Sequence, residues 1–243
     1  MELTFDEDKH EYRVGGVVYK SVTQFLSQFF EPFDAEGIAE KLAKKPQNKK
    51  EGKDKEYFLN LWKERADHGT RVHEAIELYT NGGGGWIKLN HEDILKVHNA
   101  IRFLDNRDKK NLVAVTPEKK IFSNDIQLAG TIDRFELYND RSISLIDWKT
   151  NNHISKLGFD GQMAKEPLEE YPDASITKYS LQLNLYAWMV LKELNKNKKI
   201  PYTVRELKLV HLITEGTGYE VYDIKYSPEL IEEVLKYVEE KTN

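Results

Sequence analysis

Cysteine is absent from this chain of 243 residues, and its absence removes several kinds of chemistry at once. Disulfides, thiolate zinc sites, iron–sulfur clusters and cysteine nucleophiles all need that side chain. A metal bound by this protein must therefore be held by oxygen atoms or by imidazole.

Long apolar runs and an excess of positive charge are missing as well. The longest uncharged stretch of the C-terminal third, residues 179–191, contains Gln182 and Asn184, and the N-terminus is acidic, so we expect neither a membrane span nor a signal peptide. The net charge of −5 counts against a protein that coats DNA through a diffuse cationic surface. It is compatible with an enzyme that contacts phosphates through divalent cations, because the carboxylates that hold such ions add negative charge.

The motifs of several other enzyme classes are lacking too. The chain has no GxGxxG, P-loop, HExxH or GxSxG pattern, so nucleotide-fuelled motors, zincins and serine hydrolases have no local support. Positive charge is concentrated instead in residues 41–55, which carry seven lysines against Glu51 and Asp54. That composition favours a solvated loop.

The hydrophobic spacing predicts one order of helices and strands. A hairpin is expected around Gly15 and Gly16, followed by helical spacing from 21 to about 45 that is interrupted near Pro32. Further helices are predicted at 55–80, 94–104, 176–194 and from 228 onward, and strands at 112–115 with 119–122, 131–138, 142–149, 204–213 and 219–226. This order indicates an α/β or α+β core with a mixed sheet. We expect one compact domain, with a hairpin and helical extension in residues 1–55 and the core in residues 56–243.

Residues 130–149, GTIDRFELYNDRSISLIDWK, carry the clearest chemical signal. If the loop between the two strands lets Tyr138 pair with Ser142, continuing that register places Asp133 directly opposite Asp147. The rest of that face is apolar, so the two carboxylates end an otherwise buried surface. Opposed carboxylates repel and lose hydration when buried, and a hard divalent cation would offset both costs.

Lys149 follows Asp147 at the spacing that puts both side chains on one face of a strand, with Trp148 on the other. The ammonium group could orient or deprotonate a water molecule, or neutralise charge that grows on a phosphate in the transition state. The plain alternative is a salt bridge at the edge of a sheet.

Two further pairs lie one helical turn apart. His73 and Glu77 could share a metal shell, although a lone helical histidine is more often a satisfied surface or core residue. The Gly-Thr step before them suggests that a helix begins or kinks there, with Thr70 as its cap. Gln182 and Tyr186 lie in an apolar stretch and need partners, which a phosphate, a water molecule or core hydrogen bonds would supply.

The ordered segments GTRVHEAIE, GTID, DWK and QLNLY together resemble the RecB-like branch of the PD-(D/E)xK nuclease superfamily, which includes phage-type exonucleases. These segments span residues 69–186, and their order and spacing carry the resemblance. It implies a restriction-endonuclease-like αβββαβ core, in which helices flank a central mixed sheet, with the N-terminal hairpin and helices added to it.

The resemblance also implies roles for individual residues. The implied metal ligands are His73, Asp133, Asp147 and the Trp148 carbonyl, and the implied catalytic residues are Lys149, Asp147, Asp133 and Glu77. Gln182, Tyr186, Thr70 and Thr150 are expected to support the site or contact DNA. Glu118 matches an additional acidic position, but a register that pairs Phe122 with Ile126 puts it on the opposite face.

The function implied is a Mg²⁺- or Mn²⁺-dependent deoxyribonuclease that hydrolyses phosphodiester bonds, most closely an exonuclease of DNA recombination, repair or replication. Its substrate would be single- or double-stranded DNA that has free ends, and its protein partner would be a recombinase or a single-strand-binding protein. It would act in the cytoplasm of a bacterial or phage-infected cell. Two alternatives are an inactive nuclease-like module that binds DNA ends or a recombination partner, and a metal phosphoesterase of small nucleotides. The complete set of Asp133, Asp147 and Lys149 argues against the inactive module.

Overall fold

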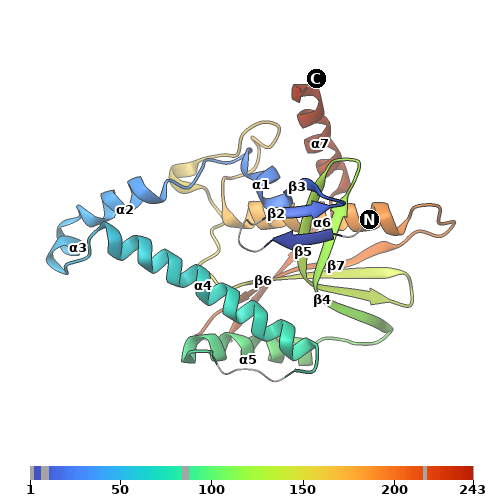
Figure 1. The fold of residues 1–243 in the computed structure, drawn as a ribbon, viewed down its shortest axis with the longest axis horizontal. Helices are drawn as coiled ribbons and strands as arrows, with labels where there is room; N and C mark the ends of the chain where they lie inside the picture. Colours follow the sequence, from blue (N-terminus) through green and yellow to red (C-terminus); the bar gives the residue numbers. More distant parts are fainter. Residues whose placement is uncertain (1–2, 7–10, 84–87, 216–217, 243) are drawn as a thin grey trace.

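The computed structural model describes residues 3–6, 11–83, 88–215 and 218–242 of the chain (Figure 1). Its strands are β1 (Leu3–Asp6), β2 (Glu11–Val14), β3 (Val17–Ser21), β4 (Leu112–Ser123), β5 (Leu128–Tyr138), β6 (Ser142–Lys149), β7 (Thr203–Leu212) and β8 (Tyr219–Ile224). Its helices are α1 (Val22–Ser27), α2 (Ala35–Ala43), α3 (Pro46–Lys50), α4 (Lys55–Thr80), α5 (His91–Asp105), α6 (Ser175–Leu194) and α7 (Pro228–Thr242), with a short 3₁₀ turn at Phe159–Gly161. The expected order of helix, three strands, helix and strand is present.

All eight strands belong to one mixed sheet. The strand order is β1-β2-β3-β5-β6-β7-β8, and β4 pairs with β5 beside this path. β4, β5 and β6 form an antiparallel meander, whereas β6 and β7 run parallel, so the chain must cross over between them through α6. The predicted fold class is therefore confirmed.

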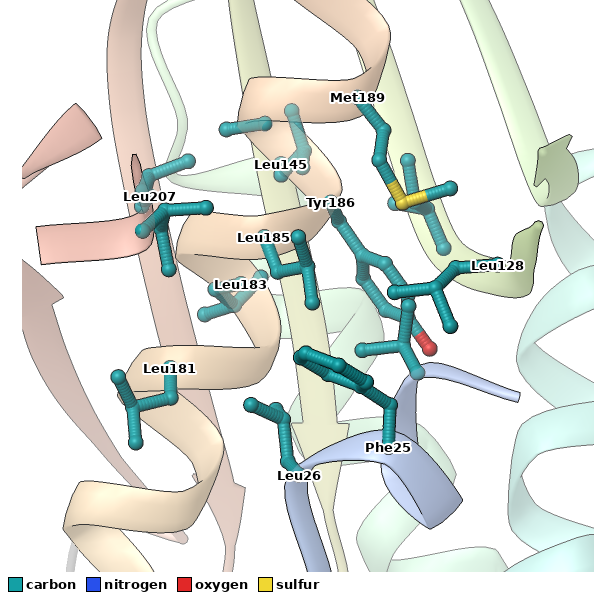
Figure 2. Packing of buried hydrophobic residues seen from close by; sticks show 14 of the residues in the cluster. Phe25, Leu26, Leu128, Leu145, Leu181, Leu183, Leu185, Tyr186, Met189 and Leu207 are labelled. Carbon is teal, nitrogen blue, oxygen red and sulfur yellow. The ribbon is translucent and has the colours of Figure 1, made fainter. Parts of the chain in front are cut away.

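Helices cover the two faces of the sheet because alternate residues of its central strands are apolar on both sides. On one face, Leu145 and Leu207 pack with Leu183 of α6 and with Phe25 of α1, as Figure 2 shows. On the other face, Ile146, Trp148 and Val210 pack against α4 and α5. Because both faces of β6 are buried, any charged side chain on this strand lies inside the protein.

The N-terminal hairpin joins the same sheet. Gly15 and Gly16 have φ angles of 56° and 88°, so they make the predicted turn with a backbone that glycine adopts without strain. β3 then pairs in parallel with the beginning of β5, at Lys20 with Leu128. Ser21 ends β3 and caps α1, which directs the chain from the hairpin into the first helix.

The prediction of a solvated loop over residues 41–55 is wrong. α2 continues to Ala43, and after two residues α3 begins at Pro46, a residue whose fixed φ angle suits a first helical turn. The Asn48 side chain donates a hydrogen bond to the Leu42 carbonyl and ties the two helices together. Solvation was inferred correctly for Lys49 and Lys50, which are exposed, but solvation did not prevent a helix.

The expected helix start or kink at Thr70 is also wrong. α4 runs without interruption from Lys55 to Thr80, and Asp54 caps its N-terminus. The exposed Thr70 hydroxyl donates to the Ala66 carbonyl within the same helix, at 3.3 Å. The preceding Gly69 serves a different purpose, because a β-carbon there would lie 3.1 Å from the Thr150 hydroxyl oxygen. Glycine thus lets α4 pass close to the end of β6.

None of the helices in the described part of the chain is long and apolar enough to cross a bilayer.

Gly130 in β5 is a second close approach, and it can be tested. A β-carbon at this position would lie 2.5 Å from the buried Tyr186 ring, so we expect Gly130→Ala to lower the free energy of unfolding by about 1–3 kcal/mol. This loss should exceed the smaller gain from replacing glycine in a strand. Urea unfolding measures the difference.

The matched control is the same substitution in a Tyr186→Leu background, where the smaller side chain leaves room for a methyl group. The destabilisation by Gly130→Ala should be smaller there. An equal loss in both backgrounds would contradict the explanation by contact with the ring.

Candidate metal and catalytic site

The candidate site lies where β5 and β6 end their pairing. The register is the predicted one: Arg134 pairs with Ile146, and one further step places Asp133 opposite Asp147. The ladder does not continue in the ordinary way, because Asp133 Oδ2 accepts a hydrogen bond from the Trp148 backbone nitrogen at 2.7 Å. The Asp133 carboxylate therefore accepts a hydrogen bond that a backbone carbonyl of the neighbouring strand would accept in a regular ladder.

Asp147 and Lys149 share one face of β6, as predicted. Asp147 Oδ2 lies 2.7 Å from Lys149 Nζ, and only 5% and 17% of the two side chains is exposed. The ammonium also lies 4.5 Å from the centroid of the Tyr179 ring. Trp148 points to the other face, where its ring meets Phe103 edge-on. The alternative of a salt bridge at a sheet edge is right about the ion pair but wrong about its place, because β6 lies between β5 and β7 inside the sheet.

Burial dominates the electrostatics of this pair. It raises the pKa of Asp147 to about 6; the Lys149 ammonium acts against this shift, and the charge of Asp133 adds to it. Burial works to lower the pKa of Lys149, but the carboxylates of Asp147 and Asp133 outweigh it, so that pKa lies above its ordinary value. Lys149 therefore stays protonated in this environment.

Glu118 belongs to the site, which corrects the expected register of β4. Phe122 pairs with Ala129 and not with Ile126, because the connecting loop comprises residues 124–127 and Ser123 pairs with Leu128. The register differs from the expected one by an odd number of residues, which turns a side chain to the opposite face. Glu118, with a φ angle of 43° between its paired neighbours, consequently lies on the side of Asp133.

His73 from α4 completes a cluster with Glu118 and Asp133. One possible ligand atom from each of the three lies within 4.8 Å of the others. His73 Nδ1 is 3.6 Å from Asp133 Oδ2 and 4.0 Å from Glu118 Oε1. Carboxylate oxygens with one imidazole nitrogen are a donor set that fits a divalent metal ion.

The charge balance of the cluster also fits a cation. Burial raises the pKa of Glu118 to about 8, with further contributions from the negative charges of Asp133, Glu77 and Asp147. The part of this shift that comes from neighbouring carboxylates shows that their negative charge is not fully compensated at Glu118. A divalent ion would supply the compensation, so the residues present fit the implied metal.

The other predicted residues lie at different distances from this cluster. Glu77 follows His73 by one turn of α4, and its charge reaches Glu118. Thr150 lies against Gly69, and its carbonyl accepts a hydrogen bond from Lys96 Nζ at 2.6 Å. The Thr70 hydroxyl is used within its own helix. The Trp148 carbonyl as a metal ligand stays a prediction.

Gln182 and Tyr186 lie on α6, on the face of the sheet that carries Asp147. Gln182 Nε2 donates a hydrogen bond to the Tyr186 hydroxyl at 3.2 Å. Core hydrogen bonding was one of the alternatives that the sequence allowed for these two residues. Burial raises the pKa of Tyr186, and the charges of Asp147 and Asp133 add to the shift. The phenol is therefore a neutral group next to the carboxylates.

A polar contact between α4 and α5 escaped the sequence analysis. Asp93 of α5 is fully buried; it accepts a hydrogen bond from Arg71 Nε at 2.7 Å and also contacts His68 Nδ1. Lys96 of the same helix holds the Thr150 carbonyl, directly after Lys149. Asn90 and Asp93 form a capping box, whose three-residue spacing could have been recognised in the sequence. The contacts to α4 could not, because they have no fixed spacing.

The raised pKa of Glu118 predicts how stability depends on pH without metal. A folded-state pKa of about 8, above the usual 4.5, means that the folded protein binds this proton more tightly than the unfolded chain. The resulting stability is present below about pH 4.5 and is lost as the pH rises towards 8. We expect Glu118→Gln to make this fall shallower in urea unfolding with EDTA, measured between pH 5 and pH 8.

Glu74→Gln is the matched control, because Glu74 is exposed on α4. It should leave the pH dependence as it is in the unmodified protein. If Glu118→Gln behaved like this control, the electrostatic description of the cluster would be wrong.

Comparison with known families agrees with this geometry. A model described as the PD-(D/E)XK nuclease superfamily matches residues 24–243. The match includes every residue discussed in this site and begins after the hairpin of β1, β2 and β3. Among curated proteins, none matches the chain.

Proposed function

This chain belongs to the PD-(D/E)XK nuclease superfamily, and from that premise we propose that it is a Mg²⁺- or Mn²⁺-dependent deoxyribonuclease of the RecB-like type, acting as an exonuclease at DNA ends. The observation that supports it best is the buried group of Asp133, Asp147 and Lys149 at one end of the sheet, with His73 and Glu118 beside it. The four motif segments support the RecB-like assignment.

The residues that would hold the metal are His73, Glu118, Asp133 and Asp147. The first three have ligand atoms close enough to share one ion, and Asp147 lies next to Asp133 across the ladder. When bound, the ion would polarise the phosphodiester and favour ionisation of a water molecule. The protein contributes a rigid carboxylate arrangement, because the Trp148 backbone nitrogen fixes Asp133 and Lys149 contacts Asp147.

Lys149 acts as a charged hydrogen-bond donor in this proposal. Its raised pKa argues against a role as the base that deprotonates water and favours neutralisation of charge on the phosphate in the transition state. Asp147 orients the ammonium at 2.7 Å, and the Tyr179 ring limits its movement. Gln182 and Tyr186 support the same face from α6.

An inactive binding module is less consistent with these contacts. A buried ion pair costs desolvation energy that a well-packed apolar pair would avoid. The retention of Asp147 and Lys149 inside the protein is explained by catalysis, whereas DNA binding alone does not need them buried.

The cellular setting follows from the motif resemblance. We propose that the protein acts in the cytoplasm of a bacterial or phage-infected cell, in recombination, repair or replication, together with a recombinase or single-strand-binding protein. Export of a tagged copy from the cytoplasm would contradict this setting.

The deciding experiment compares linear and circular DNA, single- and double-stranded, with label at an end or inside. We expect Mg²⁺ or Mn²⁺ to support release of end label, EDTA to abolish it, and circular DNA to resist. Asp147→Asn should reduce cleavage by more than ~100-fold while retaining the circular dichroism spectrum, because it removes a ligand. Asp105→Asn, at an exposed position on α5, should cleave normally.

Other outcomes of that experiment have definite meanings. Cleavage of circular DNA would replace the exonuclease by an endonuclease. Hydrolysis of a mononucleotide phosphodiester with no activity on DNA would identify a small-nucleotide phosphoesterase. Full activity of Asp147→Asn would overturn the assignment of the site.

Lys149→Ala separates binding from turnover. We expect DNA affinity, measured in Ca²⁺, to change little while the cleavage rate falls by roughly 100- to 1,000-fold, because the proposed contact strengthens only in the transition state. Lys156→Ala, at an exposed lysine of the following loop, is the control for loss of a nearby positive charge. A parallel loss of affinity and rate would make Lys149 a phosphate anchor.

A further inference from the structure

The N-terminal hairpin reaches the site although it precedes the segment that matches the family. Tyr12 of β2 is buried, with 8% of the residue exposed. Its hydroxyl lies 3.0 Å from the Thr131 hydroxyl oxygen in β5. Residues separated by more than a hundred positions in the chain thus share a hydrogen bond two residues before Asp133.

The position of Tyr12 is fixed by the sheet. Tyr12 pairs with Tyr19 across the hairpin, and β3 pairs in parallel with β5 at Leu128 and Ala129. The Tyr12 ring packs against Phe5, with 4.6 Å between ring centroids. The phenol is therefore held over the beginning of β5 by backbone pairing and by ring packing.

Thr131 lies close to the site along β5. Because side chains alternate along a strand, Thr131 and Asp133 lie on the same face of β5. Thr131 also pairs with Lys120 of β4, two residues after Glu118. A hydroxyl bonded to Thr131 thus acts at the point where the strands carrying Asp133 and Glu118 run side by side.

The electrostatics agree with that location. Burial raises the pKa of Tyr12, and the negative charges of Glu118 and Asp133 add to the shift. The hydroxyl is therefore protonated and close enough to sense both carboxylates. The neutral Tyr12 hydroxyl has Thr131 as its hydrogen-bond partner.

We propose that Tyr12 is a positioning residue of the metal site, which acts through Thr131 to hold Asp133 and Glu118 at the spacing that a divalent ion requires. The proposal rests on the proposed function and extends it to the hairpin, which becomes a part of the nuclease site. In this proposal Tyr12 does not contact the substrate.

Tyr12→Phe tests this assignment, because it keeps the ring and its packing and removes only the hydroxyl. We expect Mn²⁺ affinity, measured by titration calorimetry without DNA, to fall by roughly 10- to 100-fold, the usual effect of losing a group that orients a metal ligand. DNA affinity in Ca²⁺-free buffer and the urea midpoint should change little. The cleavage rate at low Mn²⁺ should fall and recover at high Mn²⁺.

The hairpin offers a matched control. Tyr19→Phe also removes one phenol hydroxyl, but that hydroxyl donates to Asn124 Oδ1 in the loop after β4, at 2.9 Å. It should leave Mn²⁺ affinity unchanged. Thr131→Val should reproduce the effect of Tyr12→Phe, and Thr131→Ser, which keeps a hydroxyl, should largely restore affinity.

Two results would overturn the proposal. Unchanged Mn²⁺ affinity of Tyr12→Phe would mean that the hydroxyl does not position the ligands. An equal loss in Tyr19→Phe would mean that the hairpin contributes stability alone. Since calorimetry measures metal binding directly, these results remain distinct from a failure of the unmodified protein to cleave DNA.

Discussion

The repulsion between carboxylates at one buried end of the sheet is the constraint on which the rest of this structure depends. Asp133 and Asp147 face each other across β5 and β6, and Glu118 approaches from β4. Asp147 is buried and the other two carboxylates are partly buried, which weakens the screening of their charges by water. Lys149 offsets only part of that charge. A site with this surplus is arranged for a cation, and its geometry is held by neighbours that cannot relax away.

Close contacts of the backbone supply that rigidity. Gly69 lets α4 pass the end of β6, and Gly130 leaves space for the Tyr186 ring. Asp93 and Lys96 connect α5 to α4 and to the carbonyl after Lys149. The site therefore depends on elements from both sides of the sheet, and disturbing one element changes the spacing of ligands carried by another.

Structural features that depend on neighbours along the chain were predictable from the sequence. The register of β5 and β6 follows from a short turn and an alternating apolar pattern, so the opposition of Asp133 and Asp147 was predictable. It failed at Glu118, where one additional loop residue reversed the face. The prediction of a loop at residues 41–55 was also wrong. The charged composition indicates that these residues are solvated, but whether they form α3 depends on local backbone preferences. The division of the chain at residue 55 and the roles of the site residues stay predictions.

By itself, the sequence determined the order of the elements, the chemical types available for a metal site and the pairing within the β5–β6 hairpin, since these depend on local spacing and side-chain alternation. The tertiary structure alone decided that His73 and Glu118 meet at Asp133, and that Tyr12 reaches Thr131. Those contacts join segments far apart in the chain. Their distances are set by loop length, helix packing and sheet pairing acting together, and none of these has a fixed spacing in the sequence.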